Sequence, residues 1–199
     1  MAIAARRVGA ENSATRALIV KATLELIREE GYASVSTRRV AAQAGLKPSL
    51  VHYYFPTTDD LLLAVSRIGE EESDRMIETA LASEDPVRAL WDFYTDTSRM
   101  ELALEFMALA NHRKALRQQM AEHCADMRRR EAEVLARLIG ERMGAMQGCA
   151  PAGLSLVLAG IGRALIMEGT LGVSEGHAEA KAFVEQWLDG LKPLSPQTD

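Results

Sequence analysis

The 199-residue sequence predicts an all-α fold, and three observations lead to that prediction. Ala, Leu, Met and Glu, which favour helices, are abundant, whereas aromatic residues make up only 5% of the chain. Apolar residues recur at helical spacing in successive segments, and few segments show the alternating, β-branched pattern of strands. We therefore expect about nine helices in total, and a hydrophobic content of 48% is enough for a substantial core.

The first predicted helix begins at Ser13 or Thr15, since either side chain can cap it, and ends near Glu30. Gly31 follows as a helix stop. Residues 1–12 precede this helix and are expected to form a disordered basic arm.

A pair of short helices is predicted next, separated by a tight turn. One begins after the N-cap Ser36 and ends at Gly45, and the other begins at Pro48 and ends near Phe55. Two turns of helix, a short turn opened by glycine and two further turns are typical of a helix-turn-helix unit. In such a unit the second helix enters the major groove of DNA.

The remainder of the chain predicts a larger helical body. Expected helices cover about 57–81, 86–100, 102–110, 114–140, 152–171 and 175–191, with a connector at 144–151 and a polar tail at 193–199. The apolar stretch 150–167 contains Ser155, Arg163 and several glycines and prolines. We interpret it as a buried helix rather than a membrane span.

Charge is distributed unevenly between these two parts. Residues 1–60 carry 8 Lys and Arg against 6 Asp and Glu, whereas residues 61–199 carry 15 against 22. The whole chain has a formal net charge of −5, so the basic excess is confined to the N-terminal part. This asymmetry favours a module that contacts phosphates, joined to a body that does not.

Basic residues at the start of the second helix also favour an anionic partner. Arg38 and Arg39 lie in its first turn, where positive charge is unfavourable to an isolated helix. DNA phosphates that meet Thr37, Arg38 and the backbone N–H groups would reverse that cost. A solvated charge pair is the alternative interpretation.

The third helix has the composition of a surface that reads DNA. On helical spacing Val51 and Phe55 point inward, whereas Ser49, His52 and Tyr53 point away. Such exposed side chains contribute little to folding, but hydroxyl and imidazole groups can contact phosphates and base edges. The pattern therefore predicts that this helix is the recognition helix.

The residues of this region together resemble a known family. The spacing of the DNA-binding domain of the TetR family of repressors is matched by Gly31-Tyr32, Ser36-Thr37-Arg38-Arg39-Val40-Ala41, Ala44-Gly45-Leu46, Val51-His52-Tyr53-Tyr54-Phe55-Pro56 and Asp60-Leu61. The resemblance covers residues 13–61, and the remainder matches only in its helical layout.

The TetR resemblance implies an N-terminal three-helix DNA-binding domain at 13–58 and a ligand-binding and dimerisation domain at 59–192. It further implies a homodimer that binds a palindromic operator in double-stranded DNA and represses transcription until a small molecule occupies the larger domain. Carried over by position, the DNA contacts fall on Thr37, Arg38, Pro48, Ser49, Leu50, His52, Tyr53 and Thr58.

Two positions depart from the family pattern. Lys47 stands where a capping Ser or Thr is common, so the third helix loses a side-chain cap, although Lys47 can itself contact a phosphate. Thr58 replaces the usual Lys at the start of the fourth helix, which removes one phosphate contact. These departures leave the operator sequence undetermined.

Two apolar stripes near the C-terminus predict a dimer interface. One stripe of small residues lies on the helix from residue 152 and one apolar face lies on the last helix; together they comprise Gly153, Val157, Gly160, Ala164, Phe183, Val184, Trp187, Leu188 and Leu191. Two such helices from each subunit would make a four-helix interface. Packing of both stripes on their own chain is the alternative.

Large, adaptable residues in the middle helices predict a ligand cavity. They are Met76, Trp91, Tyr94, Met100, Phe106, Met107, Met120 and Leu165. The nine methionines suit a plastic apolar cavity, so we expect a largely apolar small-molecule effector such as a lipid, steroid or acyl thioester. Each of these residues can equally be ordinary core.

Other functional classes lack support in the sequence. The motifs H-E-x-x-H, E-x-x-H and G-x-x-x-x-G-K-[ST] are missing, so we expect no enzyme activity, metal site or cofactor. Cys124 and Cys149 form no disulfide or metal pattern and no signal peptide is recognisable, so we expect a cytoplasmic protein without membrane association. The alternative function is a DNA-binding regulator or architectural protein that has no small-molecule effector.

Overall fold

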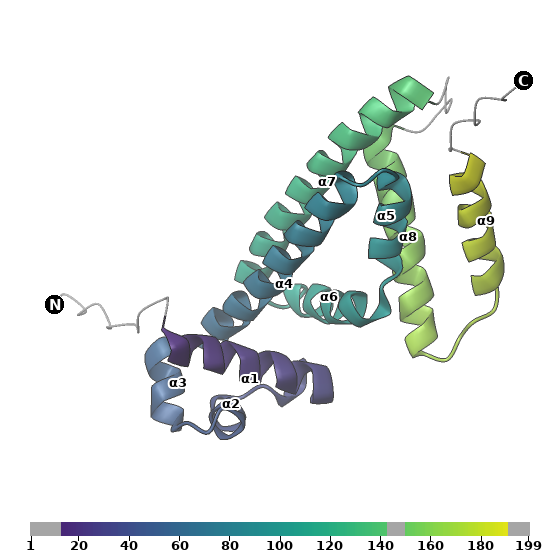
Figure 1. The fold of residues 1–199 in the computed structure, drawn as a ribbon. Coiled ribbons are helices and arrows are strands. Elements are labelled where there is room, and N and C mark those ends of the chain that lie inside the picture. The colour runs from purple at the N-terminus through teal and green to yellow at the C-terminus, as the bar shows by residue number, and fades with distance from the viewer. Residues whose placement is uncertain (1–12, 143–149, 191–199) are drawn as a thin grey trace, which may run out of the picture. The chain divides into compact units, whose positions relative to one another are not determined.

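The computed structural model describes residues 13–142 and 150–190, and within these ranges it contains nine α-helices and no β-strand (Figure 1). The helices are α1 (Ala14–Glu30), α2 (Thr37–Gln43), α3 (Pro48–Tyr54), α4 (Thr58–Leu81), α5 (Pro86–Thr95), α6 (Thr97–Ala110), α7 (Lys114–Arg142), α8 (Pro151–Thr170) and α9 (His177–Gly190). A 3-10 turn, η1 (Tyr32–Ser34), follows α1. The predicted all-α fold is confirmed. Most of the predicted connector and the whole tail lie outside the described residues.

The helices are divided between two units, and α4, α6 and α7 each contribute residues to both. The first unit contains α1, α2, α3, α4 as far as Glu71, and residues 105–121. The second contains α4 from Glu72, α5, α6 as far as Leu104, α7 from Glu122, α8 and α9. The first unit thus extends past residue 58 and includes a segment, 105–121, that the sequence assigned to the larger domain.

Side-chain caps decide where α1 and α2 begin. Ser13, one of the two predicted caps of α1, accepts a hydrogen bond from the backbone N–H of Thr15 at 3.2 Å. Ser36 caps α2 and accepts from the backbone N–H of Arg39 at 3.3 Å. These bonds satisfy donors that have no partner within the helix, which explains why sequence reasoning located both starts.

The turn between α2 and α3 depends on Gly45. Its φ of +66° is left-handed, a conformation that L side chains adopt only with strain. The N–H of Leu46 donates to the carbonyl oxygen of Ala41 at 2.8 Å, and that of Gly45 to Ala42 at 3.2 Å. This is a Schellman motif, which ends α2 and redirects the chain into α3.

The second unit is built around one apolar cluster. It includes Ile77, Leu90, Trp91, Tyr94, Leu135, Leu158, Val184 and Leu188, which come from α4, α5, α7, α8 and α9. Gly162 of α8 lies against α5: a Cβ there would stand 2.4 Å from the carbonyl oxygen of Tyr94. The two helices therefore approach so closely that no side chain fits at this position.

One helix boundary differs from the prediction. The sequence predicts a single helix over 86–100, whereas the chain leaves helical geometry at Asp96 and α6 begins at Thr97. Asp96 has extended backbone, its carboxylate accepts from the Ser98 hydroxyl at 2.9 Å, and its carbonyl accepts from the Met100 N–H at 3.1 Å. Asp96 thus serves as the N-cap of the next helix, a role that Asp favours.

Candidate functional site

Helix α3 exposes a polar face to solvent and buries its opposite, apolar face. Val51 and Phe55 are 1% and 3% exposed, as their spacing predicts. Ser49, His52 and Tyr53 are all exposed. The same helix therefore fixes itself in the first unit through one face and offers hydroxyl and imidazole groups on the other.

Contacts with the start of α1 hold the end of α3 in place. The Ser13 hydroxyl donates to the Tyr54 hydroxyl at 2.9 Å, and the Arg16 guanidinium lies 4.9 Å from the centre of the Phe55 ring. Tyr53 packs edge-on against Tyr54 with ring centres 5.2 Å apart. Because these contacts join residues about forty positions apart, the orientation of α3 is set by tertiary structure as well as by its own turn.

The two arginines at the start of α2 have different surroundings. Arg39 forms an ion pair and hydrogen bond with Glu30, which raises the pKa of Arg39 and lowers that of Glu30 from their ordinary values. Arg38 is exposed and has no ion-pair or hydrogen-bond partner among the described residues. Of the two, Arg38 is therefore the cation available to an external anion.

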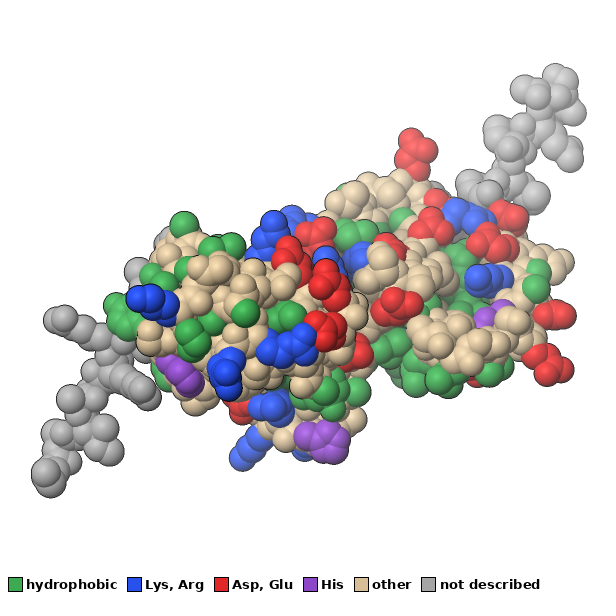
Figure 2. Space-filling view, turned by 90° about the horizontal axis from the view of Figure 1, so that it is seen from below, with side chains coloured by type: hydrophobic (Ala, Val, Ile, Leu, Met, Phe, Trp, Pro, Cys, Tyr) green, Lys and Arg blue, Asp and Glu red, His purple; other side chains and the backbone are tan. Residues whose placement is uncertain are grey.

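The remaining predicted DNA contacts lie at the starts of α3 and α4. Lys47 is exposed and makes no side-chain cap to α3, as the departure from the family pattern predicts. Thr58 is exposed and opens α4, next to a reciprocal cap in which Thr57 and Asp60 exchange hydrogen bonds of 2.7–3.1 Å. Figure 2 shows basic side chains and histidine at the surface of the molecule.

All nine predicted DNA contacts are therefore accessible, and they lie in one unit. Arg38, Lys47, Pro48, Ser49, His52, Tyr53 and Thr58 are exposed, and Thr37 and Leu50 are half-buried. They occupy the first turn of α2, the N-cap and five of the seven residues of α3, and the first residue of α4. Their contact with DNA itself remains a prediction.

The predicted ligand residues do not form one group. Trp91, Tyr94, Met100 and Leu165 are buried in the apolar cluster of the second unit, and Met76 packs against it. Phe106, Met107 and Met120 belong to the first unit, because residues 105–121 do. The hydropathy pattern identified core residues of both units but could not show that the chain divides between them.

A buried polar network lies in the second unit and was not predicted. Glu131 of α7 is 0% exposed and accepts a hydrogen bond from the Tyr94 hydroxyl at 2.5 Å. Its other carboxylate oxygen accepts from the hydroxyl of buried Ser155, and Arg128 lies 3.7 Å from that oxygen. Arg128 also donates to Ser155 at 2.6 Å. The network joins α5, α7 and α8 within a core that the sequence predicted to be apolar.

The sequence does carry a signal for this network, although a weak one. Glu131 falls midway between Met127 and Leu135 at four-residue spacing, so it belongs to the apolar stripe of a helix that otherwise reads as charged. Its partners Tyr94 and Ser155, however, are distant in sequence, and only Arg128 is close to it. Only the fold shows that a tyrosine and a serine complete the site.

The predicted dimer stripe is exposed on α8 but only in part on α9. Val157, Gly160, Ala164 and Phe183 are exposed, Gly153 and Trp187 are half-buried, and Leu191 lies outside the described residues. Among the described residues α8 is the one helix long and apolar enough to cross a membrane, and 33% of its most apolar window is buried in its own chain. The rest of that window leaves an apolar surface, to which Leu156 and Met167 also contribute.

Val184 and Leu188 require a correction, because both are buried in the core of their own chain at 2% and 1% exposure. The cause is a set of polar contacts between α5 and α9. Arg88 forms ion pairs with Glu185 and Asp189, and the Trp91 indole N–H donates to Glu185 at 3.0 Å. These contacts turn the Val184 side of α9 towards α5, which withdraws it from any partner.

Comparison with known proteins places this geometry in context. The family described as bacterial regulatory proteins, tetR family, matches residues 19–65, which span the helix-turn-helix. The regulator PksA of Bacillus subtilis, described as an HTH-type transcriptional regulator, is 33% identical over 108 residues, which are 50% of this chain and 53% of PksA. The chain spans about half the length of the curated relatives it matches.

Solved structures resemble the chain over nearly its whole length. A TetR transcription regulator from Haloarcula marismortui superposes with a TM-score of 0.72 at 22% identity, covering 89% of this chain and 97% of that protein. The multidrug binding protein EbrR, complexed with imidazole, gives a TM-score of 0.61 at 24% identity and covers 94% of this chain and 100% of EbrR. At such identities the likeness establishes the fold.

Proposed function

We propose that the chain is a cytoplasmic transcription regulator of the TetR family, on the ground that residues 19–65 match the model of bacterial regulatory proteins, tetR family. As a homodimer it binds a palindromic operator and represses transcription. A small, largely apolar effector releases it. Neither catalysis nor a cofactor forms part of this function.

The observation that carries the DNA-binding proposal is the exposed face of α3. Ser49, His52 and Tyr53 project from a helix whose opposite face is buried, and such a helix fits the major groove. Arg38 and Lys47, exposed at the starts of α2 and α3, are placed to neutralise phosphates on either side.

The exposed apolar surface of α8 supports the dimer. Val157, Gly160 and Ala164 form an uncharged stripe on that surface, and the two small residues let a second copy of the helix approach closely. A two-fold dimer presents two recognition helices, and this symmetry is what a palindromic operator matches.

The effector proposal rests on the second unit and on one structural relative. The apolar cluster around Trp91, Met100 and Leu165 offers large, adaptable surfaces, and EbrR, which has the same fold, is described as a multidrug binding protein. We propose that the effector favours a dimer in which α4 holds the recognition helices at a separation that does not fit the operator.

Selection of DNA fragments by the purified protein tests the proposal. Fragmented DNA of the organism that encodes the chain is bound to wild type, to the triple variant Ser49→Ala/His52→Ala/Tyr53→Ala, and to Thr97→Ala as an exposed control outside α3. We expect wild type and control to enrich one palindrome and the triple variant to enrich none. Equal enrichment by the triple variant would show that α3 is not the recognition helix.

The alternative, an architectural protein or a regulator without an effector, makes different predictions. An architectural protein binds arbitrary DNA nearly as tightly as any selected fragment. A constitutive regulator selects a palindrome, but its affinity for that palindrome stays constant when apolar small molecules are added.

A further inference from the structure

The segment 105–121, called here the α6–α7 corner, lies in the first unit, although the sequence predicts that it is part of the larger domain. It comprises the end of α6, residues 111–113 and the first turns of α7, and it belongs to the same unit as α1–α3. Along the chain, both of its helices continue into sequence of the second unit. Its contacts within the first unit therefore show which residues of that unit this segment holds.

The corner is fixed internally by Arg117. Its Nε donates to the carbonyl oxygen of Ala110 at 3.1 Å and its guanidinium also donates to the carbonyl oxygen of Asn111 at 2.5 Å. Carbonyl groups at the end of a helix have no partner within it, so a basic side chain there closes the turn. Leu109 and Leu116 are buried at 3% and 2%, which anchors the corner in the core of the first unit.

Arg113, at the tip of the corner, forms an ion pair and hydrogen bond with Asp59. Asp59 is the second residue of α4 and follows Thr58, one of the predicted DNA contacts. Only residues 55–57 separate α3 from α4, and Phe55 among them is buried. A contact that holds Asp59 therefore also holds the point where the recognition helix ends.

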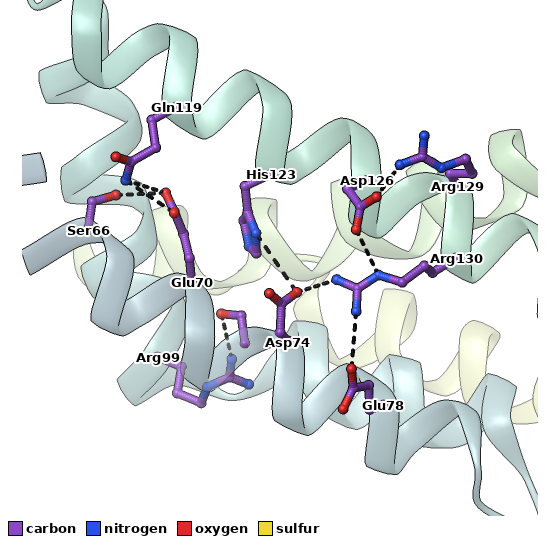
Figure 3. A network of polar contacts seen from close by, with 11 residues as sticks. Ser66, Glu70, Asp74, Glu78, Arg99, Gln119, His123, Asp126, Arg129 and Arg130 are labelled. Carbon is purple, nitrogen blue, oxygen red and sulfur yellow. Dashed lines mark hydrogen bonds and ion pairs between the residues drawn. The ribbon is translucent and has the colours of Figure 1, made fainter. Parts of the chain in front are cut away.

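A second contact joins α7 to α4 further along both helices (Figure 3). The side-chain N–H₂ group of Gln119 donates to both carboxylate oxygens of Glu70, at 3.0 and 3.1 Å, and approaches the carbonyl oxygen of Leu63 at 3.4 Å. The Ser66 hydroxyl donates to the same carboxylate at 2.9 Å. The corner thus contacts residues 58–71 of α4 near the start of this range, at Asp59, and near its end, at Glu70.

We propose that Arg113 is a positioning residue for operator binding: through Asp59 it fixes the first turn of α4 and hence the exit of α3. This inference rests on the proposed function. Arg113 also neutralises a carboxylate that would otherwise stand beside Thr58, one of the predicted DNA contacts. Both effects favour DNA binding and both act through Asp59. Asp59→Asn alone breaks the ion pair without exposing a negative charge, so weaker palindrome binding by this variant measures the positioning effect by itself.

The cycle compares Arg113→Ala, Asp59→Asn and the double variant, with Lys114→Ala as control, since Lys114 is an exposed neighbour without an ion-pair partner among the described residues. Affinity is measured for the selected palindrome and for a scrambled fragment at one salt concentration. If Arg113 acts through Asp59, Arg113→Ala weakens palindrome binding about two- to fivefold in the wild-type background. In the Asp59→Asn background Arg113→Ala then has little effect on palindrome affinity. Lys114→Ala lowers the affinity for both fragments to a similar small extent.

Hydrogen exchange of full-length protein without DNA gives a second measurement. We expect Arg113→Ala, but not Lys114→Ala, to speed amide exchange in residues 58–62. Equal weakening by Arg113→Ala in both backgrounds, or unchanged exchange, overturns this inference alone. A wild-type protein that selects no fragment overturns the proposed function as well, so the two failures are distinguishable.

Discussion

Glu131 is the residue on which the buried contacts of Tyr94, Ser155 and Arg128 converge. A fully buried carboxylate is stable only when hydrogen bonds and a nearby cation compensate for lost hydration. Tyr94, Ser155 and Arg128 supply that compensation from three helices. Burial, and next to it the Glu131 carboxylate, raises the pKa of Tyr94 far above its ordinary value, so the hydroxyl stays protonated and keeps donating.

Tyr94→Phe tests this compensation at a single atom. The ring and its packing remain, but Glu131 loses one donor, so the free energy of unfolding falls by about 2 kcal/mol in urea denaturation. Because the folded-state pKa of Tyr94 is raised, its contribution is complete below the pKa of about 10 of an unfolded tyrosine and is lost as the pH rises further.

Tyr32→Phe is the matched control, since Tyr32 is exposed. It should change the free energy of unfolding by less than about 0.5 kcal/mol. A Tyr94→Phe variant as stable as this control would mean that the network contributes nothing to stability.

Local chemistry explains which residues could be predicted. Ser13, Ser36 and Gly45 act on backbone groups within a few positions of themselves, so the sequence alone identifies their roles. Arg39 was not separable from Arg38, because its partner Glu30 lies nine positions earlier and on another helix. Glu131 lies further still from its partners Tyr94 and Ser155.

At the scale of the element, the two faces of α8 have different surroundings, one packed against α5 and the other open. Gly162 faces α5, where the carbonyl oxygen of Tyr94 leaves no room for a Cβ, whereas Gly169 has no atom within 4 Å of a Cβ position. Glycine is required at the first position for packing, while at the second it costs helix stability and has no packing role.

Alanine at these two glycines should therefore have opposite effects. Gly162→Ala forces α5 and α8 apart and lowers the free energy of unfolding by about 1–3 kcal/mol. Gly169→Ala gains helix propensity and leaves stability unchanged or raises it by up to about 1 kcal/mol. Thermal unfolding by circular dichroism measures both, and the absence of any difference would contradict the close approach of α5 and α8.

Helix periods were predictable, but which face of each helix meets which neighbour was not. The apolar residues of α9 were all assigned to a partner subunit, because a hydrophobic stripe looks the same whether it packs on its own chain or on another. The contacts of Arg88 with Glu185 and Asp189, a hundred positions away, decide that Val184 and Leu188 turn inward. The break at Asp96 was missed because the apolar period continues across it.

At the scale of the whole molecule, the proposed binding to a palindromic operator requires an association of two chains. The exposed apolar residues of α8 and Phe183 of α9 form a surface that is costly to leave in water. Gly160 lies on this surface with free space around it, so a side chain there does not disturb its own chain. The position thus separates association from folding.

Gly160→Arg should yield a folded monomer. Light scattering after size-exclusion chromatography is expected to give the mass of two chains for wild type and one for the variant, with an unchanged circular dichroism spectrum. Ala82→Arg, exposed and outside α8 and α9, should remain a dimer. A dimeric Gly160→Arg variant would exclude the α8 surface as the interface.

The whole-molecule organisation was the least predictable from sequence. The motif at residues 31–61 identified the DNA-binding domain, because turn chemistry and inward anchors there are local. The assignment of residues 105–121 to the same unit depends on contacts such as Arg113 with Asp59, more than fifty positions apart. No periodicity within one segment contains that information.

The measurement that tests the central claim most directly is the ratio of two affinities, for the selected palindrome and for a scrambled fragment of equal length. If α3 reads the operator, wild type binds the palindrome at least about 1,000-fold more tightly. The triple variant Ser49→Ala/His52→Ala/Tyr53→Ala keeps its affinity for the scrambled fragment and loses most of that ratio. A ratio that the triple variant retains would contradict the account, because something other than α3 would then recognise the sequence.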